Sequence, residues 1–326
     1  MNGIVIFGGS GFVGNNLINY LLENKITDHI YIADIKKPRD DSIKNVTYCY
    51  VDVRDPIDEK LFDCNIHSII NLAAIHRTPG HPAHEYFETN IRGAANICNF
   101  AENRNINKIV FTSSISVYGP GEDEKEENSI PMPAIPYGSS KIISEYIHRE
   151  WYNKNPKRML TISRPAVIFG KYENGNFTRI AHALQDGIFA YPGRKDTIKS
   201  CVYVKDICRY IVWRLENDSG FFLNNLCYPE KITIKKICDS FSETLHYKKA
   251  RFTVPLWSVN AIAACLKQIN IPYISDMGLD TERIIKLVKS TNISSEKLIR
   301  EGFQFQYTLR DALLDWYKEC NKQRLY

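Results

Sequence analysis

The stretch IVIFGGSGFVG, residues 4–14, decides the fold of this chain. An apolar run typical of a buried strand leads directly into Gly8, Gly11 and Gly14, and an amphipathic, helix-like segment follows. Gly8 permits a tight turn, Gly11 lets the backbone approach a pyrophosphate, and Gly14 lets the helix pack on the strand. The free N–H groups at the helix start favour an anionic ligand. We therefore predict a dinucleotide-binding turn, with cofactor contacts from Gly8, Ser10, Gly11, Phe12, Val13 and Gly14.

Strand-like and helix-like segments alternate from residue 1 to about residue 170. The apolar runs are 4–7, 30–34, 46–53, 68–73, 108–114 and 160–169, and the helical segments between them include 12–25, 85–104 and 140–152. This alternation predicts an α/β fold, a Rossmann-type doubly wound parallel sheet. We expect residues 1–170 to form the cofactor domain, with 200–227 returning to it.

A smaller substrate-binding lobe is expected from residues 171–199 and 228–326, over the C-terminal edge of the sheet. It would hold helices at 233–245 and 308–320 and the Pro-marked stretch 254–265, while 201–204 reads as a strand. The acidic run 121–128 is interpreted as a solvated loop.

Composition excludes several classes of protein. The chain has 326 residues, 44% of them hydrophobic, and a net charge of +5 with no basic block to follow a nucleic acid backbone. Its nine cysteines lack Cys-x-x-Cys spacing, so we expect reduced thiols, a cytoplasmic protein and no metal site. We see no signal peptide and no apolar run long enough to span a bilayer, so we expect no membrane partner.

Asp34 ends the second apolar run, about 20 residues after Gly14. A carboxylate there can accept both adenosine ribose hydroxyls and repels a 2′-phosphate, which favours NAD. Lys36, Lys37 and Arg39 follow and leave NADP open, although we interpret them as loop charges. At the end of the third run, Asp52 and Val53 either meet the adenine edge or form a turn.

A tyrosine and a lysine stand four residues apart where a helix is expected to begin. Tyr137 and Lys141 would share one helix face, and a nearby ammonium lowers the pKa of a phenol, which suits proton transfer at an alcohol carbon. Tyr191 and Lys195 have the same spacing, but Pro192 and Gly193 deny them a helix. Ser114 follows the fifth run and is either a substrate hydrogen-bonding group or a turn residue.

Taken together, these motifs resemble the extended short-chain dehydrogenase/reductases that modify nucleotide sugars. The segments that carry the resemblance are GGSGFVG, Asp34, Asp52-Val53, NLAA, Thr89-Asn90, SSISVYG, YGSSK and SRPAVIFG. The resemblance implies that Tyr137 is the acid/base, that Lys141 tunes it and holds the nicotinamide ribose, and that Ser114 orients the reacting oxygen. It also implies cofactor contacts from Leu72, Ala73 and Ala74, and a homodimer formed through 85–100 and 140–152.

Departures from the family pattern reduce the number of reactions that the chain is expected to catalyse. In 4,6-dehydratases the residue matching Ser114 is followed by an Asp-Glu pair, whereas here Ile115 and Ser116 follow, which disfavours water elimination. The tail lacks the Arg-Arg-x-Gly-Asp segment of the UDP-galactose 4-epimerase branch. By their place in the chain, Asn176, Arg194 and Lys199 are candidates to meet the substrate diphosphate.

Three functions follow from the resemblance. The leading one is an NAD(P)H-dependent reductase of a nucleotide-linked 4-keto sugar, such as a dTDP-4-keto-6-deoxyhexose, for surface polysaccharide synthesis. The second is an NAD-dependent C4 epimerase of a nucleotide sugar, which Asp34 favours. The third is a dinucleotide-sensing Rossmann protein without catalysis, which retention of Tyr137 and Lys141 disfavours.

Overall fold

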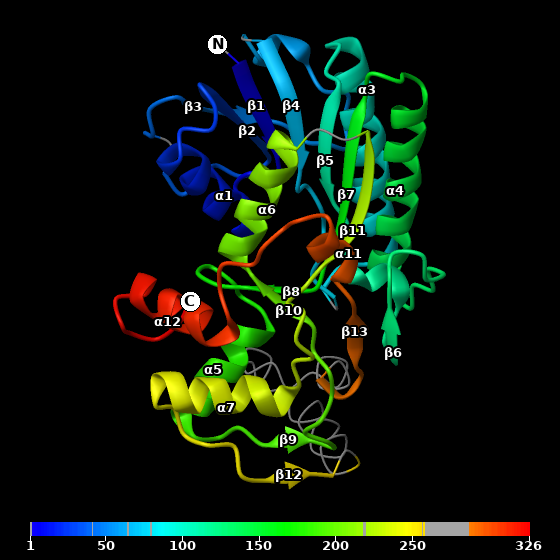
Figure 1. Cartoon of the computed structure of the whole chain (residues 1–326). Coiled ribbons are helices and arrows are strands. Elements are labelled where there is room, and N and C mark those ends of the chain that lie inside the picture. Colours follow the sequence, from blue (N-terminus) through cyan, green and yellow to red (C-terminus); the bar gives the residue numbers. More distant parts are fainter. Residues whose placement is uncertain are drawn as a thin grey trace.

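The computed structural model describes residues 2–40, 42–63, 65–78, 80–217, 220–255, 257 and 287–326. Seven strands form one parallel sheet in the order β11-β7-β5-β4-β1-β2-β3 (Figure 1). They are β1 (Asn2–Phe7), β2 (His29–Asp34), β3 (Val46–Tyr50), β4 (Asn65–Asn71), β5 (Lys108–Thr112), β7 (Met159–Pro165) and β11 (Phe221–Leu226). The predicted doubly wound fold is confirmed. Its strand order reverses between β1 and β4, where ligands bind in such sheets.

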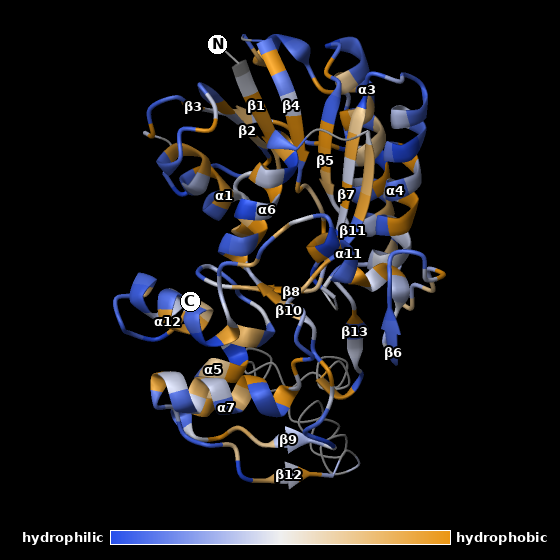
Figure 2. Ribbon diagram, in the orientation of Figure 1, coloured by the Kyte–Doolittle hydropathy of each residue, from blue (hydrophilic) through white to orange (hydrophobic). Residues whose placement is uncertain are grey.

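Helices cover both faces of the sheet (Figures 1 and 2). The side chains of residues 4–7 in β1 alternate between the two faces and are all apolar, so both faces need cover. Ile4 and Ile6 pack under α1 (Phe12–Glu23) and α6 (Val204–Glu216), which also contact each other. Val5 and Phe7 belong to the core under α3 (Gly93–Asn103) and α4 (Pro136–Asn153). The apolar strands therefore fix the sheet between two helical layers.

Short elements complete the main body. They are η1 (Glu59–Leu61), α2 (Ala83–Tyr86), the π-helix η2 (Phe87–Arg92), the 3-10 helix η3 (Ile115–Tyr118) and α11 (Glu296–Arg300), which contacts β11. Among the described residues, no helix combines the length and the apolar character that crossing a bilayer requires.

The second lobe lies beyond the C-terminal ends of the strands of the main sheet (Figure 1). It contains the helices α5 (Asn176–Asp186), α7 (Ile234–Leu245) and α12 (Leu309–Glu319), packed around a core that includes Phe169, Phe241 and Trp316. Two small parallel sheets accompany them, β8 (Val167–Phe169) with β10 (Cys201–Tyr203), and β9 (Tyr191–Pro192) with β12 (Thr253–Val254). The expected helices of the tail are confirmed, and most of the stretch 254–265 lies outside the described residues.

Two local expectations are corrected. The run 160–169 is not one strand, since the backbone N–H of Val167 bonds the carbonyl of Ser200 and so leaves the main sheet to build β8. The acidic run 121–128 is not wholly a loop either. It forms β6 (Gly121–Lys125), which pairs with the distant β13 (Thr291–Ile293).

A methyl group at Gly14 should destabilise the fold, because a Cβ there would overlap the carbonyl oxygen of Gly9. Gly9 lies in the glycine-rich turn between β1 and α1, which we call the phosphate loop. We expect Gly14→Ala to lower the free energy of unfolding by about 2 kcal/mol or more, measured by urea denaturation. The matched control is Gly121→Ala, where a Cβ meets its nearest neighbour only at 4.0 Å. Equal stability of the two variants would contradict the expected close packing of α1 on the loop.

Candidate active site

Three predicted catalytic side chains meet at the C-terminal end of β5. Pro136 occupies the first turn of α4, so Tyr137 starts that helix and Lys141 follows one turn later. Ser114 leaves β5 and caps η3, where its Oγ accepts the backbone N–H of Ser116 at 3.1 Å. The hydroxyl groups of Ser114 and Tyr137 are hydrogen-bonded to each other. The structure thus brings together residues that η3 and β6 separate in the sequence.

The ionisation of the tyrosine and the lysine is set mainly by burial. Burial raises the pKa of Tyr137, and the hydrogen bond with Ser114 only partly opposes this. Burial also lowers the pKa of Lys141 to about 7, against the attraction of Glu145. The Nζ atom of Lys141 lies 4.3 Å from the centre of the Phe111 ring, in an apolar setting.

The direction of the Tyr137 shift differs from the expectation that Lys141 lowers it. The physical reason is that the lysine is itself desolvated, so its charged form is disfavoured near neutral pH. The protein groups alone therefore keep the tyrosine protonated. A further positive charge in the site is needed to favour the phenolate.

A buried ion pair lies one helical turn beyond Lys141. Glu145 Oε2 accepts from Arg164 Nη2 at 2.6 Å and Glu145 Oε1 accepts from Arg164 Nε at 2.9 Å. Ser113 also donates to Glu145 Oε1 at 2.6 Å, and Arg164 Nη1 reaches the Tyr118 hydroxyl at 2.7 Å. Glu145 is 1% and Arg164 2% exposed, so the pair is stable only because each partner is fully hydrogen-bonded.

Glu145 is not among the residues that the sequence predicts for the site. The signal was present, because Tyr137, Lys141 and Glu145 follow one another at intervals of four and so line one face of α4. A carboxylate on the buried face of a helix is rare without a function or a partner. Its partner Arg164 lies in β7, and no spacing in the sequence marks Arg164 in the way that the interval of four marks Glu145.

The loop after β4 is tied to α4 by an asparagine of the π-helix η2. Asn90 Oδ1 accepts the N–H of Ile75 at 2.9 Å, and Asn90 Nδ2 donates to the Ile75 carbonyl at 3.1 Å and to Ser140 Oγ at 2.8 Å. π-Helical turns are frequent at functional sites. Here the turn places one amide between the loop and the residue before Lys141.

A neutral histidine supports the start of the same loop. His148 donates from Nδ1 to the Ser144 carbonyl at 2.8 Å, and its Nε2 accepts from Asn71 Nδ2 at 3.2 Å. Burial lowers the pKa of His148 to about 4. The ring stacks on Phe111 with centres 4.1 Å apart, so Phe111 contacts both His148 and Lys141.

The phosphate loop, Asp34 and the NLAA segment form one cradle. Gly8 has φ +77°, and a Cβ there would lie 2.7 Å from the Ala73 nitrogen, so only glycine permits this approach. Asp34 Oδ2 accepts the Ser10 N–H at 3.0 Å, and its Oδ1 accepts the Lys36 N–H at 3.0 Å. The carboxylate is thereby fixed beside the start of α1. This donor set fits the ribose and pyrophosphate of a dinucleotide.

The remaining predicted cofactor residues lie at the edges of this cradle. Phe12 and Val13 begin α1, and Leu72 to Ala74 follow β4. Asp52 forms a turn with Arg54, which donates from both its backbone and its guanidinium and holds the pKa of that carboxyl below its usual range. Val53 is buried. An adenine contact by Asp52 and Val53 stays a prediction.

The predicted substrate residues lie in the second lobe. Asn176 begins α5, and Arg194 forms ion pairs with Asp196 at 2.7 Å and Glu122 at 2.8 Å. Lys199 is buried and its Nζ donates to the Lys289 carbonyl at 2.5 Å. Contact of these residues with a diphosphate stays a prediction. Arg194 would have to release Glu122 or Asp196 in order to bind a phosphate.

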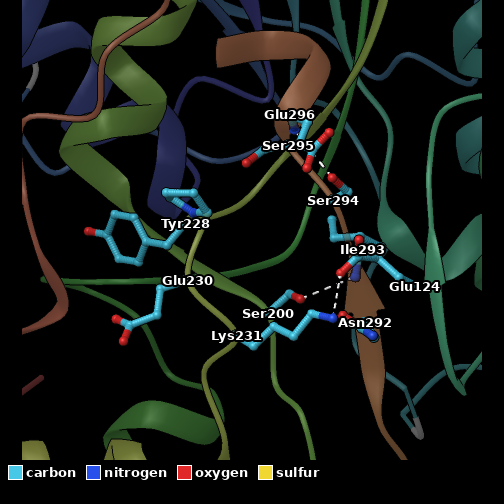
Figure 3. A pocket seen from close by; sticks show the side chains of 11 residues that line it. Glu124, Ser200, Tyr228, Glu230, Lys231, Asn292, Ile293, Ser294, Ser295 and Glu296 are labelled. Atoms are coloured by element: carbon cyan, nitrogen blue, oxygen red, sulfur yellow. Dashed lines mark hydrogen bonds and ion pairs between the residues drawn. The ribbon is translucent and has the colours of Figure 1, made fainter. Parts of the chain in front are cut away.

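A cavity of about 240 Å³ lies between β6, β13 and the segment 228–231 (Figure 3). Its wall includes Glu124 and Lys231, whose Oε2 and Nζ atoms are 3.1 Å apart. None of the predicted site residues lines it. We therefore place the candidate active site at the catalytic trio Ser114, Tyr137 and Lys141 rather than in this cavity.

Comparison with known proteins points to one family. The sequence model of the NAD dependent epimerase/dehydratase family matches residues 4–223. The N-acetyl-alpha-D-glucosaminyl-diphospho-ditrans,octacis-undecaprenol 4-epimerase of Escherichia coli O157:H7 is 30% identical over 314 residues, which cover 95% of this chain and 92% of that protein. The UDP-glucose 4-epimerase of Bacillus subtilis is 24% identical over 201 residues, which cover 58% of this chain and 59% of that protein.

Among solved structures, the UDP-glucuronic acid 4-epimerase from Bacillus cereus in complex with NAD has the same fold. Its TM-score is 0.76 at 19% identity, with 98% of this chain and 99% of that chain covered. The dTDP-glucose 4,6-dehydratase from Bacillus anthracis in complex with NAD gives a TM-score of 0.75 at 18% identity, over 99% and 98% of the two chains. At such identity the agreement concerns the fold.

Replacement of Lys141 by methionine should stabilise the protein, because folding lowers the lysine pKa from 10.5 to about 7. Between these values the unfolded chain binds more protons, so the stability of the wild type rises with pH, and the full penalty applies below about pH 7. We expect Lys141→Met to gain ~3 kcal/mol or more at pH 6, and less as the pH approaches 10.

Urea unfolding of protein stripped of dinucleotide, at pH 6 and pH 9, measures this difference. The control is Lys154→Met, since Lys154 lies at the end of the same helix and its side chain is 59% exposed. A gain for Lys141→Met that does not change with pH, or a loss at pH 6, would show that the lysine is not desolvated.

Asp34→Ala should weaken NAD binding more than NADP binding, because the carboxylate that accepts ribose hydroxyls is lost together with its repulsion of a 2′-phosphate. The guanidinium carbon of Arg39 lies 4.0 Å from the centre of the Tyr172 ring, so this cation already has an aromatic partner. We expect ~10-fold weaker NAD binding, measured by titration calorimetry with both dinucleotides. The control Asp40→Ala removes an exposed carboxylate bonded to Ser42 and should change neither affinity.

Proposed function

Because this chain belongs to the NAD-dependent epimerase/dehydratase family, we propose that it inverts C4 of a diphosphate-linked sugar. The observation that carries the proposal is the hydrogen-bonded Ser114 and Tyr137 beside buried Lys141, in a site where Ile115 and Ser116 replace an acid pair. This arrangement can move a proton at a sugar hydroxyl. Ile115 is buried and apolar, and Ser116 binds Ser114 through its backbone, so neither supplies a carboxylate for dehydration.

The residues of the chain have distinct tasks in this reaction. When bound, NAD supplies a hydride acceptor and donor at C4 of its nicotinamide. Tyr137 accepts the proton of the C4 hydroxyl as the ketone forms, and returns it to the oxygen after the sugar has turned its other face. Ser114 holds that oxygen by a hydrogen bond. Lys141 would favour the phenolate form of Tyr137 only together with the positive charge that a bound nicotinamide ring adds, because burial raises the pKa of Tyr137 and lowers that of Lys141.

Epimerase relatives favour this reaction over the 4-keto reductase that the sequence alone placed first. The relative that aligns with 95% of this chain is a 4-epimerase, and the Bacillus subtilis relative is one also. Asp34 agrees, because it favours NAD, and an epimerase returns its cofactor to the starting state in each cycle. The reductase becomes the alternative outcome of the experiment below.

The sugar carrier is proposed to be a polyprenol joined through a diphosphate, as in the name of the Escherichia coli relative. The alignment with the Escherichia coli relative covers 95% of this chain and therefore includes the second lobe. The alignment with the Bacillus subtilis relative covers 58% of this chain, so it need not reach residues 228–326. We propose that residues 171–199 and 228–326 form this substrate lobe, except for α11, which packs on the main sheet. The second candidate is a UDP-linked sugar, favoured by the UDP-glucose 4-epimerase relative. Arg194 and Lys199 are proposed to meet the diphosphate that both carriers contain.

We also propose that two copies associate through α3 and α4. Ile143 and Tyr146 on α4 are 39% and 56% exposed, which provides apolar surface for such a contact.

The proposed reaction is tested by incubating the purified protein with undecaprenyl diphosphate-linked N-acetylglucosamine in detergent, and in parallel with UDP-N-acetylglucosamine. We expect interconversion with the galacto epimer of the polyprenyl substrate, followed by NMR of the released sugar, without net change in NADH. Tyr137→Phe should reduce turnover by about 10² or more while NAD binding persists. Tyr146→Phe, an exposed tyrosine on the same helix, should leave turnover unchanged.

Two results would contradict the proposal. One is stoichiometric NADH consumption with a 4-keto sugar and no epimerisation of either substrate. The other is full turnover by Tyr137→Phe.

A further inference from the structure

Large apolar side chains lie exposed among cations at the far end of the second lobe. Ile188 and Phe252 are each 73% exposed and Trp257 is 75% exposed. We call the surface that they form with three exposed cations the outer face; its residues are Ile188, Lys248, Lys249, Arg251, Phe252 and Trp257. Single exposed apolar residues are ordinary, but a group of them on one surface marks an interaction site.

The two segments that make this face lie side by side. β9 and β12 pair in parallel, and the Tyr191 N–H donates to the Phe252 carbonyl at 2.9 Å. Lys248 Nζ donates to the Asp186 carbonyl at 3.1 Å, two residues before Ile188. In Figure 1, β9 and β12 lie at the end of the lobe farthest from the main sheet. Segments about 60 residues apart in the chain therefore meet at this face, and Trp257 follows three residues after the end of β12.

The outward side chains are not a displaced part of the core. Within the same two segments, Phe189 and Ala250 turn inward and pack on the lobe core, while Ile188, Arg251 and Phe252 turn to solvent. Each segment thus packs some of its apolar side chains on the lobe core and exposes other apolar side chains to solvent. No segment among the described residues buries Ile188, Arg251 or Phe252.

The charge of the outer face has one sign. Residues 246–257 contain Lys248, Lys249 and Arg251 and no carboxylate. The acidic side chain of the neighbouring segment, Asp186, is paired with Arg324 at 3.0 Å. Cations next to a tryptophan and a phenylalanine match an anionic lipid surface, because the cations meet the headgroups and aromatic rings favour the interfacial layer.

We propose that the outer face docks on the surface of an anionic membrane and so presents the active site to a lipid-borne sugar diphosphate. The inference rests on the proposed polyprenol-linked substrate. It departs from the sequence-based expectation of no membrane partner, which concerned segments that span a bilayer. Docking by a surface requires no such segment.

The position of β9 fits this role. The strand leaves the outer face and leads within two residues to Arg194 and within seven to Lys199, the residues proposed to meet the diphosphate. A polyprenyl chain held in the bilayer has its diphosphate at the headgroup layer. The outer face and the diphosphate candidates are thus joined by one short stretch of chain.

Flotation with vesicles tests the proposal without any substrate. We expect the full chain to float with vesicles of phosphatidylcholine and phosphatidylglycerol and to bind pure phosphatidylcholine at least tenfold more weakly. High salt should weaken binding to the anionic vesicles. Phe252→Ser with Trp257→Ser, and separately Lys249→Glu with Arg251→Glu, should each reduce binding tenfold or more.

A matched control removes two exposed apolar side chains elsewhere. Ile130→Ser with Met132→Ser deletes residues that are 79% and 70% exposed and lie outside the outer face, and it should leave vesicle binding unchanged. Circular dichroism should be used to check that all variants are folded. Equal losses in control and outer-face variants, or unchanged binding in the outer-face variants, would overturn the proposal.

Tryptophan fluorescence gives a second readout. Of the four tryptophans, Trp151 and Trp316 are buried and Trp213 is half-buried, so Trp257 should dominate any change on contact with lipid. We expect a blue shift with anionic vesicles that Trp257→Phe abolishes while retaining flotation. A shift that persists in Trp257→Phe would place the contact elsewhere and overturn the assignment.

Activity separates failure of docking from failure of the proposed function. The outer-face variants should epimerise the polyprenyl substrate normally in detergent but tenfold or more slowly in vesicles. Epimerisation in detergent without vesicle binding would overturn docking alone. Vesicle binding without epimerisation in either medium would overturn the proposed function alone. Association of two copies through Phe252 and Trp257 in sedimentation, with no lipid binding, would assign the face to a second copy and overturn docking.

Discussion

The buried ammonium of Lys141 is the constraint on which the rest of the site depends. An isolated charge in an apolar setting is strongly disfavoured, and this lysine lies against the Phe111 ring with little solvent around it. Glu145 opposes the loss of its proton, and Arg164 and Ser113 fix that carboxylate in place. These contacts tie α4, which carries Tyr137, to β5 and β7. The polar network under the helix therefore supports the proposed catalytic residues.

The fold, and the shared helix face of Tyr137 and Lys141, could be predicted because their signals are local. The glycine loop requires a positive φ at Gly8 and close packing at Gly14, and the Tyr137 to Lys141 spacing follows from the helical period. Such features involve neighbours in the chain. Asp34 belongs to the same class, since a strand end after a fixed interval is recognisable from the sequence.

The remaining features depend on contacts between distant residues. Glu145 meets Arg164 from another element, β6 pairs with β13 across 170 residues, and no periodicity announces either contact. In the protein without a dinucleotide, burial raises the pKa of Tyr137, opposite to the direction expected from Lys141 alone, for a related reason. The spacing showed that Lys141 is near, but only packing around Phe111 shows how far the lysine itself is desolvated. The burial of a side chain depends on the whole assembled core, so it cannot be predicted from that residue and its neighbours in the sequence.

The π-helix η2 shows that local helix stability and catalytic alignment oppose each other in this chain. A π turn accommodates one residue more than the α-helical pattern, with poorer hydrogen-bond geometry. Loss of a single residue between Phe87 and Arg92 would let α2 and α3 run as one regular helix, which is the more stable form locally. The same loss would rotate Asn90 away from Ile75 and Ser140. Selection on the length of this helix is therefore expected to preserve the position of Asn90 rather than local helix stability. Deletions in η2 should be rarer than deletions in the exposed loops.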